Sequence, residues 1–403
     1  MERERYLTDN ILQDLNEKMV FVGGARQVGK TTLALKLVTQ KLKNYEYYNN
    51  YQNNYKYYNW DFPPDRKRLM SFEFPGEDAL LIFDEVHKYR KWKSLIKGIY
   101  DSYKNKYKII VTGSARLNIY RKGGDSLQGR YHYYTLHPFS LAELYNIKNN
   151  VIPLKELTFN NANYNDFEQL FKFGGFPEIF LKQSEQSLRR WHNEKLERLF
   201  KEDIRDVENL RDINSVKLLG DILPSKAGSL LSVNNIREDL EVSHRAITSW
   251  LDVLEQFYYH FRIYPYHVKM IRSIKKVAKL YLVDWSEIED ESIRFENMIA
   301  SHLLKFVQYL NEYEGYKIKL NYLRNVDKKE VDFMVSTDAK PWFAVEAKLN
   351  EIQPSPNLFY YKERLKIPYV FQAVMKPGDK KDIDFIKEGV RVISAAKFLT
   401  GLI

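Results

Sequence analysis

The feature that most constrains the fold of this chain is an eight-residue run, Gly24–Thr31, which reads GARQVGKT. It matches the spacing G-x-x-x-x-G-K-[ST], follows the apolar run MVFVG and precedes the helical run TTLALKLV. In that context the glycines let backbone N–H groups turn inward around phosphates, and the helix N-terminus adds its dipole. Lys30 would place a positive charge at the β- and γ-phosphates, and Thr31 would offer its hydroxyl to Mg²⁺. The sequence therefore predicts a nucleotide site made of Gly24, Ala25, Arg26, Gln27, Val28, Gly29, Lys30, Thr31 and Thr32.

A pair of carboxylates follows a second apolar strand. Residues 79–83 read ALLIF and end in Asp84 and Glu85. Asp84 would hold Mg²⁺ through water, and Glu85 would orient or deprotonate the attacking water. The alternative is a buried strand that finishes in two solvated carboxylates. Together with the phosphate loop, the pair predicts ATP binding with Mg²⁺, followed by hydrolysis.

Polar and basic side chains near the next strand complete the expected ATP site. The run KIIVTGSAR ends its strand in Thr112 and Ser114, and Ser114 would sense the γ-phosphate. Capping of a turn is the alternative role for such residues. Arg116 and Arg130 would neutralise charge in the transition state, and Arg130, in LQGR before a strand, is the favoured finger. A plain surface arginine is the alternative for Arg130. His87, after the carboxylate pair, is expected to pack or cap there.

The order of apolar segments predicts an α/β fold. Strands are expected at residues 19–23, 55–61, 79–83, 108–112 and 131–136, with an exposed Asn- and Tyr-rich loop from Asn44 leading into the second. Strands that alternate with helices form a parallel sheet covered by helices. From about residue 155 the pattern becomes helical and charged, and from about 293 a helix precedes strands again. The 403 residues therefore divide into three predicted domains, 1–153, 154–290 and 291–403.

Composition excludes several classes of protein and site. Cysteine is absent, which removes disulfides, thiolate metal sites and Cys nucleophiles. No apolar run reaches the roughly 18 residues of a membrane helix, and the N-terminus MERERYLTDN lacks the apolar segment of a secretory signal, so a cytoplasmic protein is expected. The net charge of +10 suits a nucleic-acid partner, with a Lys-rich solvated surface as the alternative.

The motifs together resemble one family. GARQVGKTT, LLIFDEVHK, VTGSAR, SLQGRY and HPFSLAEL occur in one order, followed by FGGFPE at 173–178 and KLYLVD at 279–284. In this the chain resembles predicted prokaryotic ATPases in which an AAA-type domain precedes a conserved C-terminal domain of unknown function. The resemblance implies an AAA-type parallel-sheet P-loop domain, then a helical lid and a winged helix, then a restriction-endonuclease-like α/β domain. It also implies ATP and Mg²⁺ as ligands.

The middle block contains a helix–turn–helix pattern. Helices are expected over Ser232–Leu240 and Ser243–His260, with Ser243 as the N-cap of the second. A buried stripe of the second helix is formed by Ile247, Leu251, Leu254 and Tyr258, which leaves His244, Arg245 and Ser249 facing outward. Those three residues would meet DNA bases in a recognition helix.

A basic segment without acidic residues follows the two helices. It runs from Arg262 to Lys279 and contains Lys269, Arg272, Lys275 and Lys276. As the hairpin of a winged helix, it would touch DNA phosphates. Packing against another protein, or a solvated charged face, is the alternative.

The last block carries two carboxylates and a lysine on neighbouring strands. Asp332 lies in VDFMV, and Glu346 and Lys348 lie in FAVEAK, where alternation puts the last two on one face. A hairpin between these strands would bring Asp332 beside Glu346, and Glu296, in a helical run, would add a third carboxylate. The pattern resembles the D…E-x-K site of restriction-endonuclease-like nucleases, although Val331 rather than Pro precedes Asp332. The acids would hold Mg²⁺ and Lys348 would position water or steady charge.

These expectations converge on a Mg²⁺-dependent, ATP-binding AAA-type ATPase that associates with DNA and whose C-terminal domain cuts or grips it. The alternative is an ATP-dependent switch or scaffold in which the accessory domains bind protein and the nuclease-like domain is inactive. A nucleotide sensor of a defence system is a weaker option. An Arg130 that acts in trans would require a homo-oligomer.

Overall fold

The computed structural model describes residues 3–41, 54–114, 127–200, 212–266, 277–376 and 382–403. The chain divides into two compact units. Unit 1 contains residues 1–137 with 198–211 and 256–258, and unit 2 contains 138–197, 212–255 and 259–403. No helix among the described residues is long and apolar enough to cross a bilayer.

Unit 1 is built on a five-stranded parallel sheet with the order β2-β3-β4-β1-β5. The strands are β1 (Met19–Gly23), β2 (Tyr55–Asn59), β3 (Ala79–Asp84), β4 (Tyr107–Gly113) and β5 (Tyr131–Thr135). All five strands expected from the sequence are present, within two residues at either end. The predicted loop before β2 lies outside the described residues up to position 53. Central strands β3 and β1 are buried along their whole length, as apolar runs in a covered parallel sheet should be.

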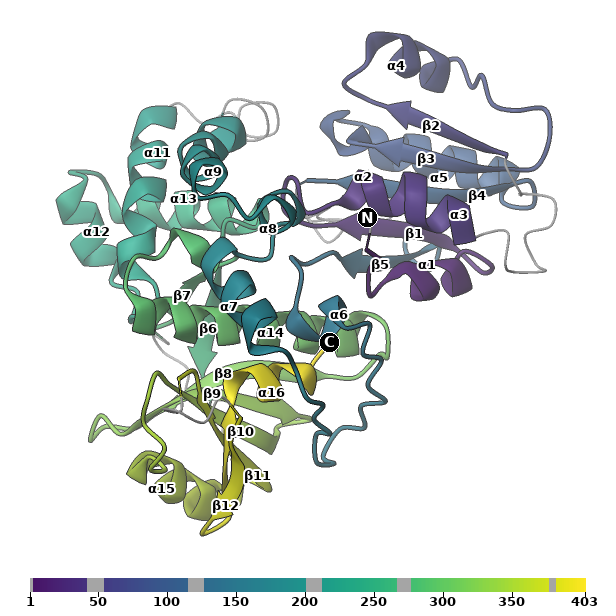
Figure 1. The fold of residues 1–403 in the computed structure, drawn as a ribbon. Helices are drawn as coiled ribbons and strands as arrows, with labels where there is room; N and C mark the ends of the chain where they lie inside the picture. The colour runs from purple at the N-terminus through teal and green to yellow at the C-terminus, as the bar shows by residue number, and fades with distance from the viewer. Residues whose placement is uncertain (1–2, 42–53, 115–126, 201–211, 267–276, 377–381) are drawn as a thin grey trace. The chain divides into compact units, whose positions relative to one another are not determined.

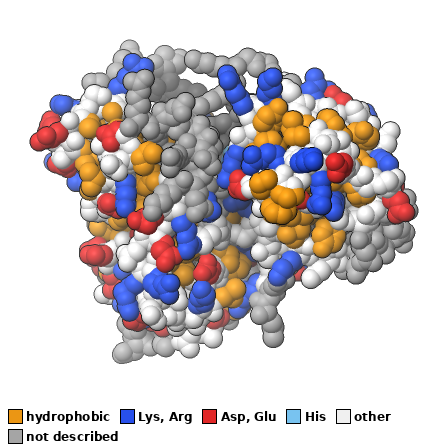
Figure 2. All heavy atoms as spheres, turned by 90° about the horizontal axis from the view of Figure 1, so that it is seen from above, with side chains coloured by type: hydrophobic (Ala, Val, Ile, Leu, Met, Phe, Trp, Pro, Cys, Tyr) orange, Lys and Arg blue, Asp and Glu red, His pale blue; other side chains and the backbone are white. Residues whose placement is uncertain are grey.

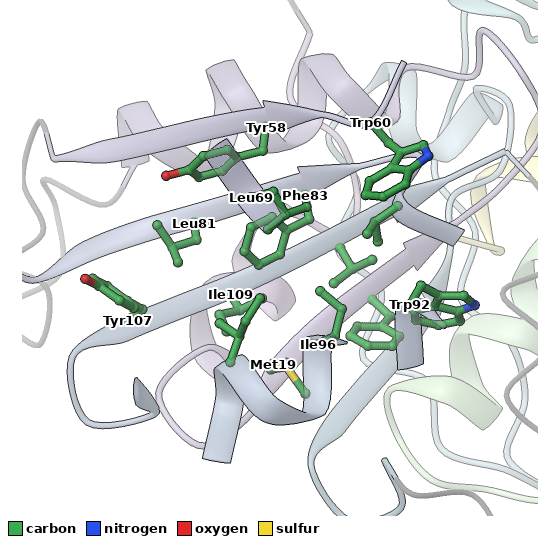
Figure 3. Close-up of a cluster of buried hydrophobic side chains, with 14 of the residues drawn as sticks. Met19, Tyr58, Trp60, Leu69, Leu81, Phe83, Trp92, Ile96, Tyr107 and Ile109 are labelled. Carbon is green, nitrogen blue, oxygen red and sulfur yellow. The ribbon is translucent and has the colours of Figure 1, made fainter. Parts of the chain in front are cut away.

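The described helices of unit 1 lie before β1 and between the strands from β1 to β4. They are α1 (Thr8–Asp14), α2 (Lys30–Thr32), the π-helical segment Leu33–Val38, α3 (Thr39–Lys41), α4 (Pro63–Met70), the 3₁₀ turn Val86–Lys88 and α5 (Trp92–Tyr103). Helix α5 buries Trp92, Ile96 and Ile99, which recur at helical spacing. These side chains meet Phe21, Phe83 and other strand residues in the aromatic-rich core drawn in Figure 3. This core holds β1, β3 and β4 in place, so that the three strands end at the same edge of the sheet.

Unit 2 is built on an eight-stranded mixed sheet with the order β12-β13-β11-β10-β9-β8-β6-β7. Its strands are β6 (His260–Pro265), β7 (Lys279–Leu282), β8 (Ile318–Arg324), β9 (Glu330–Thr337), β10 (Lys340–Lys348), β11 (Tyr369–Val374), β12 (Asp384–Lys387) and β13 (Val390–Ser394). Strand β6 pairs with β8 through Tyr264 and Asn321. The sheet therefore continues across residue 290, where the sequence predicts a domain boundary.

Helices of unit 2 precede and cover this sheet. The described ones are α6 (Leu141–Leu144), α7 (Tyr164–Phe173), α8 (Pro177–Lys182), α9 (Glu185–Arg198), α11 (Ile213–Ile222), α12 (Val233–Asp239), α13 (His244–Gln256), α14 (Glu291–Glu312), α15 (Pro356–Leu365) and α16 (Ala395–Thr400), with 3₁₀ turns at Leu223–Lys226 and Trp285–Glu287. Helix α13 is shorter than predicted, because it ends at Gln256 and the chain reverses at Tyr258, which has a positive φ of 59°. His260 then begins β6 instead of ending the helix.

Charges of both signs are distributed over the face of the molecule shown in Figure 2. Lys and Arg side chains are spread over the face shown in Figure 2, and Asp, Glu and hydrophobic side chains lie among them. The excess of positive charge is therefore not gathered into one basic patch among the described residues of that face.

Candidate functional site

The phosphate loop lies between β1 and α2, at the carboxyl end of the parallel sheet of unit 1. Gly29 has a φ of 100° and Gly24 a φ of 152°, and a Cβ on Gly24 would lie 2.5 Å from the Leu136 carbonyl oxygen. Both positions thus need glycine. The buried Arg5 donates from Nη1 to the Val28 carbonyl at 2.8 Å and braces the loop from outside. Arg5 was not singled out from the sequence, where nothing distinguishes it from other N-terminal arginines.

Lys30 begins α2 and is only 6% exposed. Its Nζ donates to the Gly24 and Ala25 carbonyl oxygens, each at 2.9 Å. The ammonium thus lies folded over its own loop, where phosphate oxygens could replace the two carbonyls. The next residue, Thr31, donates its hydroxyl to Asp84 Oδ2 at 3.0 Å. The two residues expected to hold Mg²⁺ are therefore in contact.

Asp84, at the end of β3, accepts hydrogen bonds from hydroxyl groups on three different elements. Besides Thr31, Oδ1 accepts from Thr112 Oγ1 on β4, and Oδ2 accepts from the Tyr57 hydroxyl on β2 at 2.7 Å. Burial, with the charges of Asp84 and Glu85, raises the pKa of Tyr57, so its phenol stays a donor. The sequence did not single out Tyr57, one of several tyrosines around β2. The contact follows from strand order, since β2 and β3 are neighbours.

Glu85 lies just beyond β3 with a positive φ of 55°. Its carboxylate accepts from the Ser114 backbone N–H at 3.0 Å and from the Ser114 hydroxyl at 3.1 Å. On the other side, Nε2 of His87 lies 3.6 Å from Glu85 Oε2. Burial lowers the pKa of His87 to about 3, and within the described part of the chain neither ring nitrogen has a hydrogen-bond partner. His87 is thus packed as a neutral imidazole beside Glu85, and it caps nothing.

Arg130 lies at the opposite end of the sheet from the phosphate loop. It directly precedes β5, and its carbonyl accepts from Met19 N–H at the start of β1. Its guanidinium donates to Asp101 of α5, from Nε at 2.7 Å and from Nη2 at 3.2 Å. Arg130 is therefore not brought to the nucleotide site of its own chain. Arg116, the other candidate, lies outside the described residues.

A second candidate site lies in unit 2, where the antiparallel pairing of β9 and β10 brings Asp332 beside Glu346. Asp332 Oδ2 accepts from the Ala347 N–H at 2.9 Å, and Lys348 Nζ lies 3.2 Å from Glu346 Oε1. Burial raises the pKa of Asp332 well above its usual range, and the charges of Glu296 and Glu346 add to this. Burial also raises the pKa of Glu346, against the opposing charge of Lys348. Glu346 Oε2 is buried and has no hydrogen-bond partner among the residues that the structure describes.

Glu296, on α14, was predicted from the sequence as a third metal ligand, but its carboxylate makes contacts with other side chains. Its Oε1 accepts from the Tyr281 hydroxyl at 2.7 Å and from Lys279 Nζ at 3.2 Å. Lys279 Nζ also lies 2.6 Å from Glu330 Oε1. Among the described residues, no group of three or more His, Asp or Glu side chains is arranged to hold a metal ion. Asp332 and Glu346 therefore remain as the pair that could hold a metal ion. Tyr281 and Lys279 also belong to this cluster, which the spacing of residues in the sequence did not predict.

The position of Lys279 in the structure contradicts a prediction about the basic segment. It was expected on a hairpin that touches DNA, but it is 4% exposed and turns toward the carboxylates. The reason is that β7, although it is the last strand of the sheet, is covered: it pairs with β6, its first residue is bridged to Leu230, and all four of its residues are buried in unit 2. The other predicted phosphate contacts, Lys269, Arg272, Lys275 and Lys276, lie outside the described residues. The base of the hairpin is present as the antiparallel pair β6–β7.

The start of α13 has the exposure expected of a recognition helix. His244, Arg245 and Ser249 are exposed, and the Ser243 hydroxyl caps the helix by accepting from the Ala246 N–H at 3.1 Å. Ile247 and Leu251 are buried on the opposite face.

Two motifs that carry the family resemblance meet in the interior of unit 2. A Cβ on Gly174, in FGGFPE, would lie 2.8 Å from Asp284 Oδ1, in KLYLVD. Asp284 is buried and accepts from Trp191 Nε1 at 2.8 Å and from Lys195 Nζ at 3.2 Å. Lys195 holds the pKa of Asp284 below its usual range despite burial. These two motifs therefore pack against each other inside unit 2, where their role is structural.

Comparison with known families agrees with this organisation. Residues 16–145 match the model of an AAA domain, and residues 164–286 and 293–398 match two domains of unknown function, DUF8612 and DUF4143. The sheet order and phosphate loop define unit 1 as a P-loop nucleotide-binding fold. The chain consists of an N-terminal AAA domain followed by domains of unknown function, as the resemblance implied.

Similar proteins of known sequence are uncharacterized. One from Methanocaldococcus jannaschii is 24% identical over 363 residues, which cover 87% of this chain and 79% of that protein. One from Haemophilus influenzae is 23% identical over 390 residues, covering 91% and 92%. Among solved structures, a variant of Thermotoga maritima RuvB has a TM-score of 0.32 at 16% identity, covering 64% of this chain and 90% of its own. The Aeropyrum pernix ORC1 protein in complex with DNA has a TM-score of 0.34 at 11% identity, covering 75% and 94%. Such TM-scores indicate only a weak likeness.

Proposed function

We propose that this protein is a Mg²⁺-dependent ATPase of the AAA type. The observation that carries the proposal is the convergence of Thr31, Asp84, Glu85 and Ser114 where the parallel strands end, next to a loop whose glycines are sterically required. The hydroxyl and carboxylate oxygens of Thr31 and Asp84 are hard ligands of the kind that Mg²⁺ prefers. They would hold the ion, which supplies charge neutralisation at the β- and γ-phosphates.

The described contacts suggest how the residues act. Lys30 exchanges two backbone carbonyls for phosphate oxygens when ATP enters, which costs little because both partners are acceptors. Ser114 holds the Glu85 carboxylate by two hydrogen bonds, and because a carboxylate can accept more than two, Glu85 can accept a proton from water while Ser114 holds it. A γ-phosphate oxygen would compete with Glu85 for the Ser114 hydroxyl. ATP binding would thus be sensed beside the base.

A magnesium titration of ATP turnover tests the proposal. Wild-type protein should release phosphate from ATP only with Mg²⁺, and Asp84→Asn should raise the Mg²⁺ needed for half-maximal turnover at least tenfold. Glu77→Gln, an exposed carboxylate that precedes the same strand, is the matched control and should behave as wild type. Turnover that survives chelation of Mg²⁺, or equal Mg²⁺ dependence of both variants, would contradict it.

The wider proposal assigns residues 1–153 to the ATPase domain, 154–290 to a helical lid and winged helix, and 291–403 to a restriction-endonuclease-like domain. Support for the winged helix comes from the order α11, the bridged residue Leu230, α12, α13 and the hairpin β6–β7. Arg130 could act as a finger only in trans, in a homo-oligomer, since it lies away from its own site and pairs with Asp101.

DNA association through α13 is tested by salt dependence. The affinity for a fluorescent duplex should fall steeply between low and moderate salt, because phosphate contacts release counterions. Arg245→Ala should weaken binding about tenfold, and Arg190→Ala, an exposed arginine on α9, should not. Salt-insensitive or absent binding would favour the alternative of a protein-binding switch.

The carboxylates of unit 2 support a metal-dependent phosphodiesterase. Asp332 and Glu346 fit a divalent cation because Glu346 Oε2 is buried and lacks a hydrogen-bond partner. They would hold the ion, which supplies Lewis-acid activation of a phosphate. Lys348, beside Glu346, would steady developing charge. Cleavage of DNA with Mn²⁺ that is lost in Glu346→Gln would support this activity, and cleavage that persists in the variant would refute it.

A further inference from the structure

Lys279 occupies an unusual position within the carboxylate cluster of unit 2. It begins β7, is 4% exposed, and places Nζ 2.6 Å from Glu330 Oε1 and 3.2 Å from Glu296 Oε1. The two acids come from different elements, β9 and α14, so a single ammonium joins three parts of the unit. Tyr281, two residues along β7, points to the same place and donates to Glu296.

The charges in the cluster are nearly balanced without any bound ion. Four acidic side chains, Glu296, Glu330, Asp332 and Glu346, stand against three basic ones, Lys279, Arg324 and Lys348. The ammonium of Lys279 lies on the Glu296 side, whereas Lys348 lies on the Glu346 side. The uncompensated charge belongs to the Asp332–Glu346 pair, where Glu346 Oε2 lacks a hydrogen-bond partner. Glu296 and Glu346 thus each have a lysine beside them, and the one negative charge left over belongs to the Asp332–Glu346 pair as a whole.

We propose that Lys279 is a tethered cation that takes the second cation position of this site, so that one divalent ion binds at Asp332–Glu346 and none at Glu296. The proposal rests on the metal-binding part of the proposed function. It makes Lys279 a positioning residue: it fixes Glu296 and Glu330 and limits how many ions enter. With Arg324 and Lys348 alone the four acids would leave two negative charges, and the ammonium of Lys279 offsets one of them, so the cluster can take one further cation but not two.

Mn²⁺ binding to nucleotide-free protein tests the proposal. All variants carry Asp84→Asn, so that the carboxylate beside the phosphate loop does not contribute. Calorimetry should count one Mn²⁺ per chain in this background and none after Glu346→Gln. Adding Lys279→Met should create a second Mn²⁺ site at Glu296, or tighten Mn²⁺ binding at least tenfold. Adding Glu296→Gln to Lys279→Met should remove that gain. The proposal is overturned if Lys279→Met binds Mn²⁺ with unchanged number and affinity.

Thermal stability gives a second readout that does not depend on activity. Lys279→Met removes the ammonium from the half-buried Glu296 and leaves Glu330 with Arg324 alone, so its Tm should fall. Mn²⁺ should restore that Tm, because the ion takes the place of the ammonium, and it should raise the Tm of Lys279→Met with Glu296→Gln much less. A Lys279→Met protein that stays unfolded at saturating Mn²⁺, while the double variant folds, would contradict the proposal.

The outcomes separate this inference from the proposed function. If the background protein binds no Mn²⁺ and Lys279→Met binds one, the exclusion of an ion by Lys279 is supported, whereas the ion at Asp332–Glu346 and metal-dependent cleavage by the wild type are both refuted. If the background protein binds one Mn²⁺ and Lys279→Met also binds one with equal affinity, the metal site stands and the role of Lys279 falls.

Discussion

Lys30 offers a quantitative test of the phosphate loop. The side chain is 6% exposed, and its two hydrogen bonds of 2.9 Å to Gly24 and Ala25 hold it ready over the loop. Lys30→Met keeps the length of the stem and removes the charge. A hydrogen bond from a charged donor contributes about 1.5–3 kcal/mol, so losing one such bond to a phosphate should weaken ATP binding about 10- to 150-fold.

Calorimetric titration with ATP and Mg²⁺ measures this loss directly. Lys56→Met, which removes an exposed lysine on β2 of the same sheet, is the control and should keep the wild-type Kd. A thermal melt of Lys30→Met without ligand should stay cooperative, which excludes unfolding as the cause. A Kd for Lys30→Met within threefold of the wild type would refute the assignment of this loop as the phosphate site.

Two further predictions concern stability. Gly174→Ala should lower the free energy of unfolding by about 1–3 kcal/mol in urea, because a Cβ would strain φ of 74° and meet Asp284. Gly315→Ala, with a φ of 73° but open space around its Cβ, should cost less, and equal losses would show that the contact is irrelevant. Burial lowers the pKa values of His87 and His302 to about 3, below their ordinary 6.5. As the pH falls, these histidines therefore take up protons in the unfolded chain before they do so in the folded protein. Each of them should lower the free energy of unfolding by about 2 kcal/mol at pH 5 and by nothing above pH 7. Urea melts of the Gln variants should show a shallower loss between pH 7 and pH 5, and an unchanged slope would argue against neutral burial.

Much of unit 1 was predictable because its strands are local signals. Each is a short apolar run bounded by turn residues, and the carboxyl ends of parallel strands meet at one edge. That geometry alone places Asp84 near Thr31, as found. Strand order is not local, so the contact of Tyr57 with Asp84, across the β2–β3 pair, was not anticipated. The sequence position of Arg130 likewise does not reveal which edge of the sheet it borders, so only the structure limits its predicted role as a finger to action in trans.

The same limits apply to unit 2. Alternation along two adjacent strands was enough to bring Asp332 to Glu346 and Lys348, because a hairpin is nearly a local structure. Helical periodicity, with Tyr258 as the last residue of the buried stripe, extended the predicted helix to His260. In the structure α13 ends at Gln256, and His260 begins β6. In the sequence, Lys279 could be recognised only as one positive charge within a basic segment. Its burial depends on β7 joining β6, which no window of sequence reveals.

The most direct test of the central claim is phosphate release from saturating ATP and Mg²⁺ by three proteins side by side. Wild type and Glu346→Gln should turn over ATP alike, because Glu346 lies in a different unit from the phosphate loop. Glu85→Gln should bind ATP with wild-type affinity and turn over at least about 100-fold more slowly, since an amide cannot accept the proton of the attacking water. Wild-type turnover by Glu85→Gln would contradict the account.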